Sequence, residues 1–352
     1  MPTRKRTTLK DIARVTGYSV PLVSVALSGK IDGTTKLSEK TREKILKVAL
    51  ELDYKPNIFG RSLRANKSFL VGVLMFDVND WLTGSFVRGA QDVLASAGYA
   101  PVFLSHSTKE EQRCNLEICL DRRVDGVIFN LWIDEKTGEM DDEFVRSVLG
   151  SKFPFVEVYG NYFGDAVSVN IDYENSFHAS CLEMIKRGAK RLVMVNHDQY
   201  TAGQDGTEVY FNAWEACKGY EKAIAENGLK PEMLLHPLPS EEEMLVGMAD
   251  NAGHAFRELV SGGSIPDAVM CLNDGQAFGI IRECAALGID IPKDISVIGF
   301  GDTSICKLAS ISTCRATGEK AGAAAAELVL RQVRGEKAES SKILAPFVSR
   351  ST

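Results

Sequence analysis

The stretch TLKDIARVTGYSVPLVSVALSGK, residues 8–30, holds two helical patterns separated by a short break. In the first pattern, Thr8 lies three residues before Asp11, which approximates the spacing of a helix-capping box. Apolar side chains then recur at the interval of one helical face, at Leu9, Ile12 and Ala13. This half of the stretch therefore predicts a short helix over residues 8–15.

The break and the second pattern predict a turn followed by another helix. Gly17 can adopt the positive φ that a tight turn requires. Ser19 is a favourable cap, and Pro21 falls in the first turn of the second helix, where its missing N–H costs little. The expected buried face consists of Val23, Ala26 and Leu27.

A third helix is expected over residues 38–53, ended by Pro56, with a buried face formed by Ile45, Val48, Ala49 and Leu52. Three short helices, the first two joined by a glycine-containing turn, are typical of a helix-turn-helix unit. A small three-helix bundle that binds another protein has the same periodicity and is the alternative.

In a helix-turn-helix unit, the second helix enters the major groove of DNA and its N-terminal half faces the bases. Here that half offers mostly apolar side chains, which can contact thymine methyl groups. The candidate base contacts are Val20, Pro21, Leu22, Ser24 and Val25, and the candidate phosphate contacts are Thr8, Lys10, Ser19 and Ser24 with the amides at helix N-termini.

The charge of the chain divides at about residue 68. Residues 1–68 hold 15 Lys and Arg against 6 Asp and Glu, whereas the remaining residues hold 26 against 41. A basic head on an acidic body favours nucleic acid as the partner of the head, and a solvated basic face is the alternative.

Composition limits the class of protein. The 352 residues are 45% hydrophobic and 25% charged, which is typical of a globular protein with room for two or three domains. The basic N-terminus lacks the apolar stretch of a signal peptide, and no apolar run is long enough to cross a bilayer. We therefore expect a cytoplasmic protein.

Motifs for catalysis or metal binding are not evident. The eight cysteines lack C-x-x-C spacing and are expected to be reduced and mostly buried, so neither a metal nor a cofactor is expected. The sequence contains no G-x-S-x-G, P-loop or H-E-x-x-H motif. His197 and Asp198 are expected in a solvated loop, although a ligand contact is the alternative. These observations argue against an enzyme.

Residues 57–68, NIFGRSLRANKS, place Leu63 between Arg61 and Arg64. The segment is too short to form a stable helix alone. An apolar side chain between two arginines suits the minor groove, where a leucine can unstack a base step while the arginines meet phosphates. An ordinary interdomain linker is the alternative.

From residue 69 onwards, apolar runs alternate with helical patterns. The expected strands cover residues 70–76, 100–104, 125–130, 153–159, 191–196, 267–273 and 295–300. Continuous apolar strands joined by crossover helices predict parallel sheets covered on both faces. The chain holds too many strand-helix units for one compact sheet. We therefore expect two similar α/β subdomains with a ligand between them at the strand C-termini.

Several motifs occur together in the order found in one protein family. They are TLKDIARVTGYSVPLVSVALSG, LSEKTREKILKVALELDYKPN, RSLRANKS, LVGVLMFDVND, DGVIF and AVMCLNDGQAFGIIRECAALGIDIPKDISVIGFGD. This combination resembles the LacI/GalR family of bacterial transcriptional regulators over nearly the whole chain. The resemblance implies an all-α helix-turn-helix head (residues 1–56), a hinge that folds on operator DNA (residues 57–68) and an α/β core of two parallel-sheet subdomains, like type I periplasmic binding proteins.

The resemblance also implies that the chain crosses three times between the core subdomains. The first subdomain would comprise residues 69–165 and 301–334, and the second residues 166–300 and 335–352. Leu63 matches the leucine that the family wedges into the minor groove, within a hinge that also holds Asn57, Arg61 and Arg64. Two hinges are needed at an operator centre, which implies a homodimer and a near-palindromic site.

An effector is expected between the subdomains, as in the family. The matching positions are Asn79, Asp80, Trp81, Asn130, Trp132, Tyr159, Asn273 and Asp274. Amide and carboxylate groups beside aromatic rings suit a sugar or a sugar derivative. The alternatives are a helix cap at residues 273–274, packing between subdomains for Trp81 and a surface position for Trp132.

The chain departs from the family pattern at four places. Ala216 stands where the family usually has a ligand-contacting arginine, so a donor is missing unless Lys218 or another residue replaces it. Gly301 stands where Asp is common, and Val25 where many members have a polar or basic reader. The usual proline pair is absent from KLASISTC. The fold tolerates these changes, but ligand identity and operator sequence do not transfer.

The expected function is a DNA-binding transcriptional regulator, a repressor in carbohydrate metabolism, whose operator affinity is controlled by a sugar-like effector. A solute-binding transport protein with an appended basic head is the alternative, because the core alone resembles one. The lack of a signal peptide and the basic head count against that alternative.

Overall fold

The computed structural model describes residues 7–28, 37–55, 62, 65–76, 81–131, 140–150, 152–160, 162–164, 166–198, 211–239 and 244–352. The chain divides into two compact units, a head unit (Met1–Lys67) and a core unit (Ser68–Thr352). Each unit has its own apolar interior, and each is described by itself below.

The head unit consists of helices α1 (Leu9–Thr16), α2 (Val20–Ser28) and α3 (Glu39–Glu51). Their apolar faces meet in one small core, whose buried side chains are Ile12, Val23, Ala26, Ile45 and Ala49. These side chains belong to the three faces predicted from the sequence, so the helical periodicity is confirmed.

Local chemistry fixes the ends of these helices. The Asp11 carboxylate accepts hydrogen bonds from the backbone N–H of Thr8 at 3.0 Å and from its hydroxyl at 2.7 Å. Gly17 ends α1 with a φ of 75°, the positive value that the turn was expected to need. Ser38 caps α3 by accepting the N–H of Thr41 at 3.2 Å. The predicted first helix, its capping box and the turn at Gly17 are therefore present.

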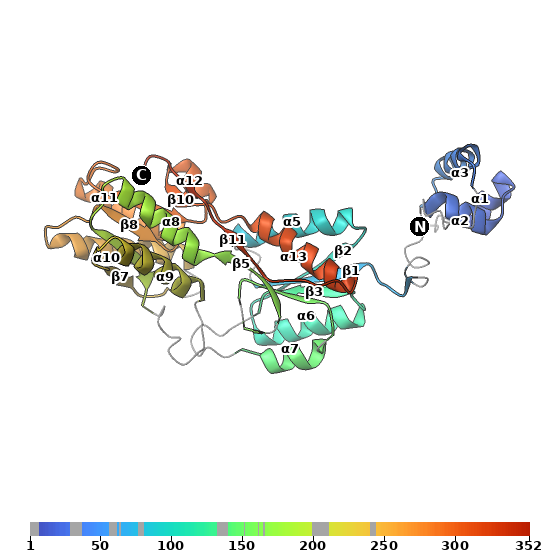
Figure 1. Cartoon of the computed structure of the whole chain (residues 1–352), viewed down its shortest axis with the longest axis horizontal. Coiled ribbons are helices and arrows are strands. Elements are labelled where there is room, and N and C mark those ends of the chain that lie inside the picture. Colours follow the sequence, from blue (N-terminus) through green and yellow to red (C-terminus); the bar gives the residue numbers. More distant parts are fainter. Residues whose placement is uncertain are drawn as a thin grey trace. The chain divides into compact units, whose positions relative to one another are not determined.

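The first sheet of the core unit is parallel throughout, in the strand order β11-β5-β4-β3-β1-β2. Its strands are β1 (Leu70–Phe76), β2 (Ala100–His106), β3 (Gly126–Phe129), β4 (Phe155–Val158), β5 (Val167–Asp172) and β11 (Ser341–Leu344). Helices α5 (Trp81–Ser96) and α13 (Gly318–Val333) cover one face, and α6 (Lys109–Asp121) and α7 (Asp142–Leu149) cover the other (Figure 1).

The second sheet has the order β12-β10-β9-β8-β6-β7 and is parallel except for β12, which is antiparallel to β10. Its strands are β6 (Leu192–His197), β7 (Met233–His236), β8 (Ala268–Cys271), β9 (Ser296–Phe300), β10 (Ser312–Cys314) and β12 (Phe347–Val348). Helices α8 (Tyr173–Lys186) and α9 (Phe211–Glu226) cover one face, α10 (Met244–Ser261) and α11 (Asp274–Leu287) cover the other, and α12 (Ser304–Leu308) follows β9.

Glycines allow the covering helices to approach one another closely. A Cβ atom added at Gly89 of α5 would lie 1.9 Å from the carbonyl oxygen of Glu319 in α13. A Cβ atom at Gly219 of α9 would lie 2.0 Å from the carbonyl oxygen of Glu174 in α8. Both pairs of helices therefore depend on a position without a side chain.

The chain passes between the two sheets three times, at segments that we call the crossings. β5 leads directly into α8, β10 leads into α13, and β11 leads into β12. The crossings are hydrogen-bonded to one another. The N–H of Ala345 donates to the Ser176 hydroxyl at 3.0 Å, and the N–H of Arg315 donates to the carbonyl of Pro346 at 2.8 Å. The core thus has the three passages implied by the family resemblance.

The predicted boundaries inside the core need three corrections. β5 pairs with β4 in the first sheet, although the range 166–300 assigned it to the second subdomain. β10 pairs with β9 in the second sheet, although the range 301–334 assigned it to the first. β11, within the range 335–352, pairs with β5 in the first sheet. The chain changes sheets directly after β5 and within a few residues after β10 and β11, so the apolar strand pattern does not show which sheet each segment joins.

The described residues test two predictions from the sequence, that the cysteines are reduced and mostly buried and that no segment crosses a membrane. All eight cysteines are free thiols, and seven of them are buried, with Cys114 exposed. Within those ranges no helix has both the length and the apolarity needed to cross a membrane. No group of three or more His, Cys, Asp or Glu side chains in the described part of the chain is placed to hold a metal ion.

Candidate DNA interface and effector site

The second helix of the head keeps its predicted reading positions away from the apolar core. Val23 and Ala26 are buried, whereas the reading side of the helix is exposed at Ser19 and Pro21 and partly exposed at Val20, Leu22, Ser24 and Val25. Thr8 and Lys10, at the start of α1, are also exposed. Short apolar and hydroxyl side chains on this face suit thymine methyl groups better than guanine edges.

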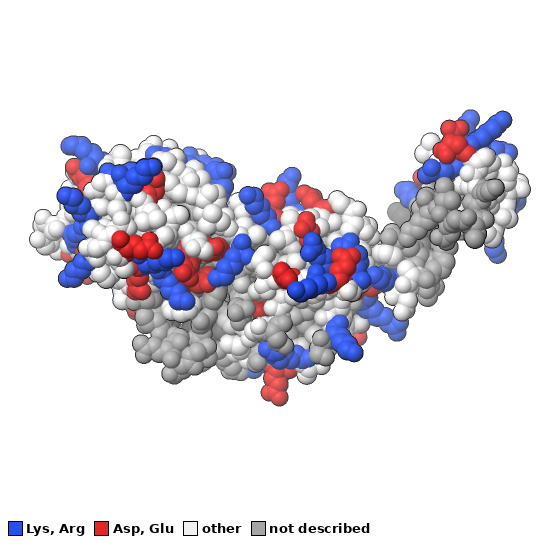
Figure 2. Space-filling view, in the orientation of Figure 1, with Lys and Arg blue, Asp and Glu red and all other residues white. Residues whose placement is uncertain are grey.

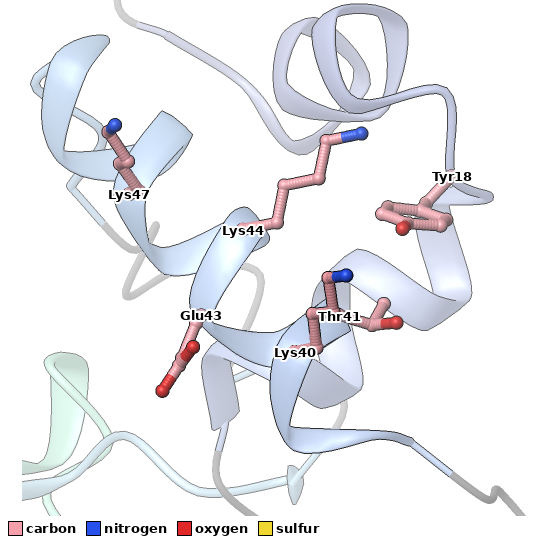
Figure 3. A pocket seen from close by; sticks show the side chains of 6 residues that line it. All are labelled: Tyr18, Lys40, Thr41, Glu43, Lys44 and Lys47. Carbon is pink, nitrogen blue, oxygen red and sulfur yellow. The ribbon is translucent and has the colours of Figure 1, made fainter.

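A shallow pocket beside α2 contains residues that the sequence analysis did not single out (Figure 3). It lies between Tyr18, in the turn before α2, and one side of α3, and it is lined by Tyr18, Lys40, Thr41, Glu43, Lys44 and Lys47. The Nζ atom of Lys44 is 5.3 Å from the centroid of the Tyr18 ring, which places a cation over the ring. The sequence signal that could have indicated this pocket is the spacing of the three lysines, which places them on one side of α3.

The pocket has the electrostatics of an anion site. Three of its four charged side chains are cations, and Glu43 points away from the Tyr18 side (Figure 3). The N-terminus of α3, capped by Ser38, adds partial positive charge. Figure 2 shows several Lys and Arg side chains on the visible surface of the head, together with a group of Asp or Glu side chains. Backbone phosphates are the anions that lie beside a helix in the major groove.

Several predicted contacts lie outside the residues that the structure describes. On the DNA side these are Asn57, Arg61, Leu63 and Arg64, and on the effector side they are Asn79, Asp80 and Trp132. Of Trp81, the structure describes the main chain at the first residue of α5. The other four effector candidates lie at or next to the carboxyl ends of β3, β4 and β8.

Asn130 follows β3 and joins three strand ends through its side chain. Its Oδ1 accepts the N–H of Phe76, at the end of β1, at 3.3 Å, and its Nδ2 donates to the carbonyl of Val158, at the end of β4, at 3.1 Å. Both ends of the amide are therefore used within the protein. Asn130 holds the carboxyl edge of the first sheet together.

Tyr159 follows β4 with a φ of 58°, in the left-handed region that non-glycine residues rarely adopt. Its ring meets the Phe86 ring of α5 at an angle of 62°, with the centroids 5.6 Å apart. The partly buried ring is thus fixed against α5 at the same carboxyl edge as Asn130.

Asn273 and Asp274 form the start of α11, which is the helix-cap alternative noted in the sequence. Asn273 Oδ1 accepts the N–H of Gln276 at 2.9 Å. The Asp274 side chain is only 2% exposed, and its two oxygens accept the Thr313 hydroxyl at 2.7 Å and the Thr303 N–H at 2.8 Å. Direct effector contact by Asp274 does not fit this geometry, because burial and internal hydrogen bonds occupy the carboxylate. Asp274 instead ties α11 to the loop after β9 and to β10.

Gly301 and Asp302 follow β9 at the carboxyl edge of the second sheet. Gly301 has a φ of 134°, a conformation that favours glycine over the Asp that the family often has here. The Asp302 carboxylate pairs with Arg315 Nε at 2.5 Å and with Arg350. Burial opposes its ionisation, but the two guanidinium groups outweigh burial and hold the pKa of Asp302 below its ordinary value. This cluster was not among the sites predicted from the sequence.

The donor that the family usually supplies from the Ala216 position is absent from this face of α9. Ala216 is 0% exposed and packs in the core. The Nζ atom of Lys218 lies 3.1 Å from the centroid of the Trp214 ring on the same helix. In this arrangement Lys218 is engaged with an indole ring and does not replace the arginine.

Buried histidines lie at the carboxyl ends of three strands: His106 ends β2, His197 ends β6 and His236 ends β7. His106 ends β2 and is 1% exposed, its Nε2–H donates to the carbonyl of Asn130 at 2.9 Å, and burial lowers its pKa to about 4. The prediction of a solvated His197 is wrong, because His197 ends β6 and is 2% exposed. Burial, and then the neighbouring His236, lower its pKa to about 4 as well.

Two family models match parts of the chain. Residues 8–57 match the model described as bacterial regulatory proteins, lacI family, and residues 183–352 match a periplasmic binding protein-like domain. Catabolite control protein A of Staphylococcus epidermidis is 25% identical over 344 residues, which are 96% of each chain. The protein of the same name from Priestia megaterium is 25% identical over 347 residues, also 96% of each chain.

Solved structures share the fold from the head to the end of the core. The Lac repressor dimer bound to operator and the anti-inducer ONPF has a TM-score of 0.72 at 20% identity, covering 99% of both chains. The complex of the regulator CelR with cellobiose has a TM-score of 0.63 at 20% identity, covering 98% of this chain and 99% of that one.

A third solved structure, a LacI family regulator from Enterococcus faecium with bound ribose, has a TM-score of 0.62 at 19% identity and covers 80% of this chain and 98% of that one. The helix-turn-helix head, the two-sheet core with three crossings, the two family models and the full-length relatives agree with one another. The chain belongs to the LacI/GalR family of bacterial transcriptional regulators.

Proposed function

We propose that this protein is a repressor whose affinity for operator DNA is controlled by a small sugar-like effector bound between the two core subdomains. One observation carries the proposal: a separate head unit exposes the reading positions of α2 beside a lysine-rich pocket. Such a regulator acts in the cytoplasm, where its DNA is, and works by binding rather than by catalysis.

Two copies of the chain are proposed to bind one near-palindromic operator. The structural neighbour on its operator is described as a dimer, which supports this arrangement. Leu63 is proposed as the wedge in the minor groove, with Arg61 and Arg64 on the flanking phosphates and Asn57 at the start of the hinge. The Tyr18–Lys44 pocket is proposed as a further phosphate contact next to α2.

The effector is proposed to be a sugar or a sugar derivative. The neighbours with cellobiose and ribose support this class of ligand. The proposed contacts are Asn79, Asp80, Trp81, Trp132, Tyr159 and Asn273, with Asn130 and Asp274 shaping the carboxyl edges of the two sheets from within. An effector that fits one arrangement of the subdomains better than another shifts their population and thereby operator affinity.

Selection from a pool of random DNA duplexes by the full-length protein tests the DNA-binding half of the proposal. We expect enrichment of a near-palindromic duplex. Leu63→Ala should weaken binding of that duplex far more than binding of random duplexes, because a wedge acts only at the operator centre. Equal losses on both kinds of DNA would remove the wedge assignment.

A thermal-shift screen with sugars, sugar phosphates and nucleosides tests the effector half. A ligand that binds the native state raises the melting temperature by mass action, by an amount that grows with its concentration. The ligand found in this way should change the affinity for the selected duplex. A protein that binds a sugar but enriches no duplex would instead favour the solute-binding alternative.

A further inference from the structure

The ion pair between Lys342 and Glu215 joins the two subdomains beside the crossings. Lys342 lies in β11, at the edge of the first sheet, two residues before the strand ends. Glu215 lies in α9, which packs against α8 on the second sheet. The Nζ atom of Lys342 is 2.5 Å from Glu215 Oε1. This pair therefore spans two bodies that the proposed effector response would move.

The carboxylate of Glu215 depends strongly on this one lysine. Its side chain is 4% exposed, and among the described residues its Oε2 atom has no hydrogen-bond partner although it is buried. Burial raises the pKa of Glu215, and the negative charges of Asp172 and Glu174 act in the same direction, against the lysine. Without Lys342, three carboxylates would share this corner and one of them would be buried.

The main chains that carry the two partners belong to different subdomains. Lys342 is in parallel register with Asn170 of β5, so it moves with the first sheet. The helix that carries Glu215 is held to α8 by the close approach at Gly219, so it moves with the second subdomain. A change in the angle between the subdomains therefore changes the distance between the main chains of Lys342 and Glu215 and strains or breaks the ion pair.

We propose that the Lys342–Glu215 pair is an electrostatic pin that holds the two subdomains in the observed arrangement, and that the effector response works against it. The pin follows from the geometry of the core alone. Its consequence for DNA binding rests on the proposed function.

Hydrogen-deuterium exchange of the full-length protein measures the pin at the crossings. Peptides over residues 312–317 and 343–348 contain the amides that bond one crossing to another. Lys342→Met should speed their exchange by about tenfold or more, because the crossings open more often. A peptide over β8 (Ala268–Cys271) should keep its rate. Lys342→Arg, which retains a cation beside Glu215, should behave as the wild type.

Lys337→Met is the matched control. Lys337 pairs with Glu339 at 2.6 Å in the same connection before β11, but both side chains are largely exposed, at 84% and 74%. Lys337→Met should leave the exchange rates at the crossings unchanged. Unchanged exchange in Lys342→Met would overturn the pin, because the pair would then have no effect on the crossings. Exchange that is faster in β8 to the same degree as at the crossings would also overturn it, because the pair would then act only on general stability.

Binding of the duplex selected with the wild type gives the functional readout. Lys342→Met should change that affinity by about fivefold or more relative to Lys337→Met, and Lys342→Arg should restore it. Equal affinities in Lys342→Met and Lys337→Met would show that the pair does not couple to DNA. If the wild type selects no duplex, the proposed function fails, while the exchange experiment still decides the pin.

Discussion

At Gly89 the contact between α5 and α13 leaves no room for a methyl group, since an added Cβ would lie 1.9 Å from the Glu319 carbonyl oxygen. Gly89→Ala should therefore lower the free energy of unfolding in urea by about 1–3 kcal/mol. Gly84→Ala in the same helix meets nothing within 4 Å and should be neutral or stabilising by up to about 1 kcal/mol. Similar effects of the two substitutions would contradict the close helix contact.

Asp274 should behave as a structural residue. Asp274→Ala removes the acceptor of the Thr313 hydroxyl and the Thr303 N–H inside the protein, so it should destabilise the core by about 3 kcal/mol. Urea unfolding measures this loss. A variant with wild-type stability that no longer responds to the effector would instead restore the direct contact expected from the sequence.

Buried His106 makes stability depend on pH in the acid range. Its pKa in the folded protein is about 4, below the ordinary 6.5, so the unfolded chain takes up the proton first as the pH falls. The stabilisation is fully present above pH 6.5 and is lost as the pH falls from 6.5 towards 4. From pH 7 to pH 5, the wild type should lose about 2 kcal/mol more unfolding free energy than His106→Gln. Equal losses would contradict the burial of a neutral imidazole.

At the scale of elements, the pair of α2 and α3 should clamp the DNA backbone through Lys44. Lys44→Gln should weaken binding of the selected and random duplexes to a similar extent and reduce the slope of log affinity against log salt by about one. Lys307→Gln removes a cation from α12 in the core unit and should leave the slope unchanged. An unaltered slope in Lys44→Gln would mean that the pocket does not meet a phosphate.

Elements with strong local signals were predictable from the sequence. The head helices follow from periodicity, Gly17 and the cap at Ser38, all of which act within a few residues. The strands missing from the prediction, such as β7 (Met233–His236) and β10 (Ser312–Cys314), are short and paired by distant segments. Their existence depends on tertiary contacts that no local pattern encodes.

The candidate sites were predictable only in part, for the same reason. The exposed face of α2 follows from helical phase, so its residues could be named in advance. The hydrogen bond from Thr313 to Asp274 joins residues 39 positions apart in the chain, and the Lys342–Glu215 pair joins residues 127 positions apart. Such contacts arise from the way the crossings bring the two sheets together, which the strand pattern did not reveal.

At the scale of the whole molecule, the head and core units should unfold independently. A fragment of residues 66–352 retains the contacts of Ser68 and Phe69, whose N–H groups donate to the Asp125 carboxylate at 2.9 and 2.8 Å. It should show the same urea midpoint as the core transition of the full chain and should have lost its affinity for the selected duplex. A lower midpoint would show that the head contributes to the stability of the core.

The last crossing sets an order of events during translation. Residues 341–348 supply the edge strand β11 to one sheet and β12 to the other, and the hydroxyl of Thr352 donates to the carbonyl of Val297 at 2.6 Å. Neither sheet can be completed until this segment has left the ribosome, whereas the head closes its own core within the first 55 residues. The DNA-binding head can therefore fold on the ribosome before the core unit that controls it is complete.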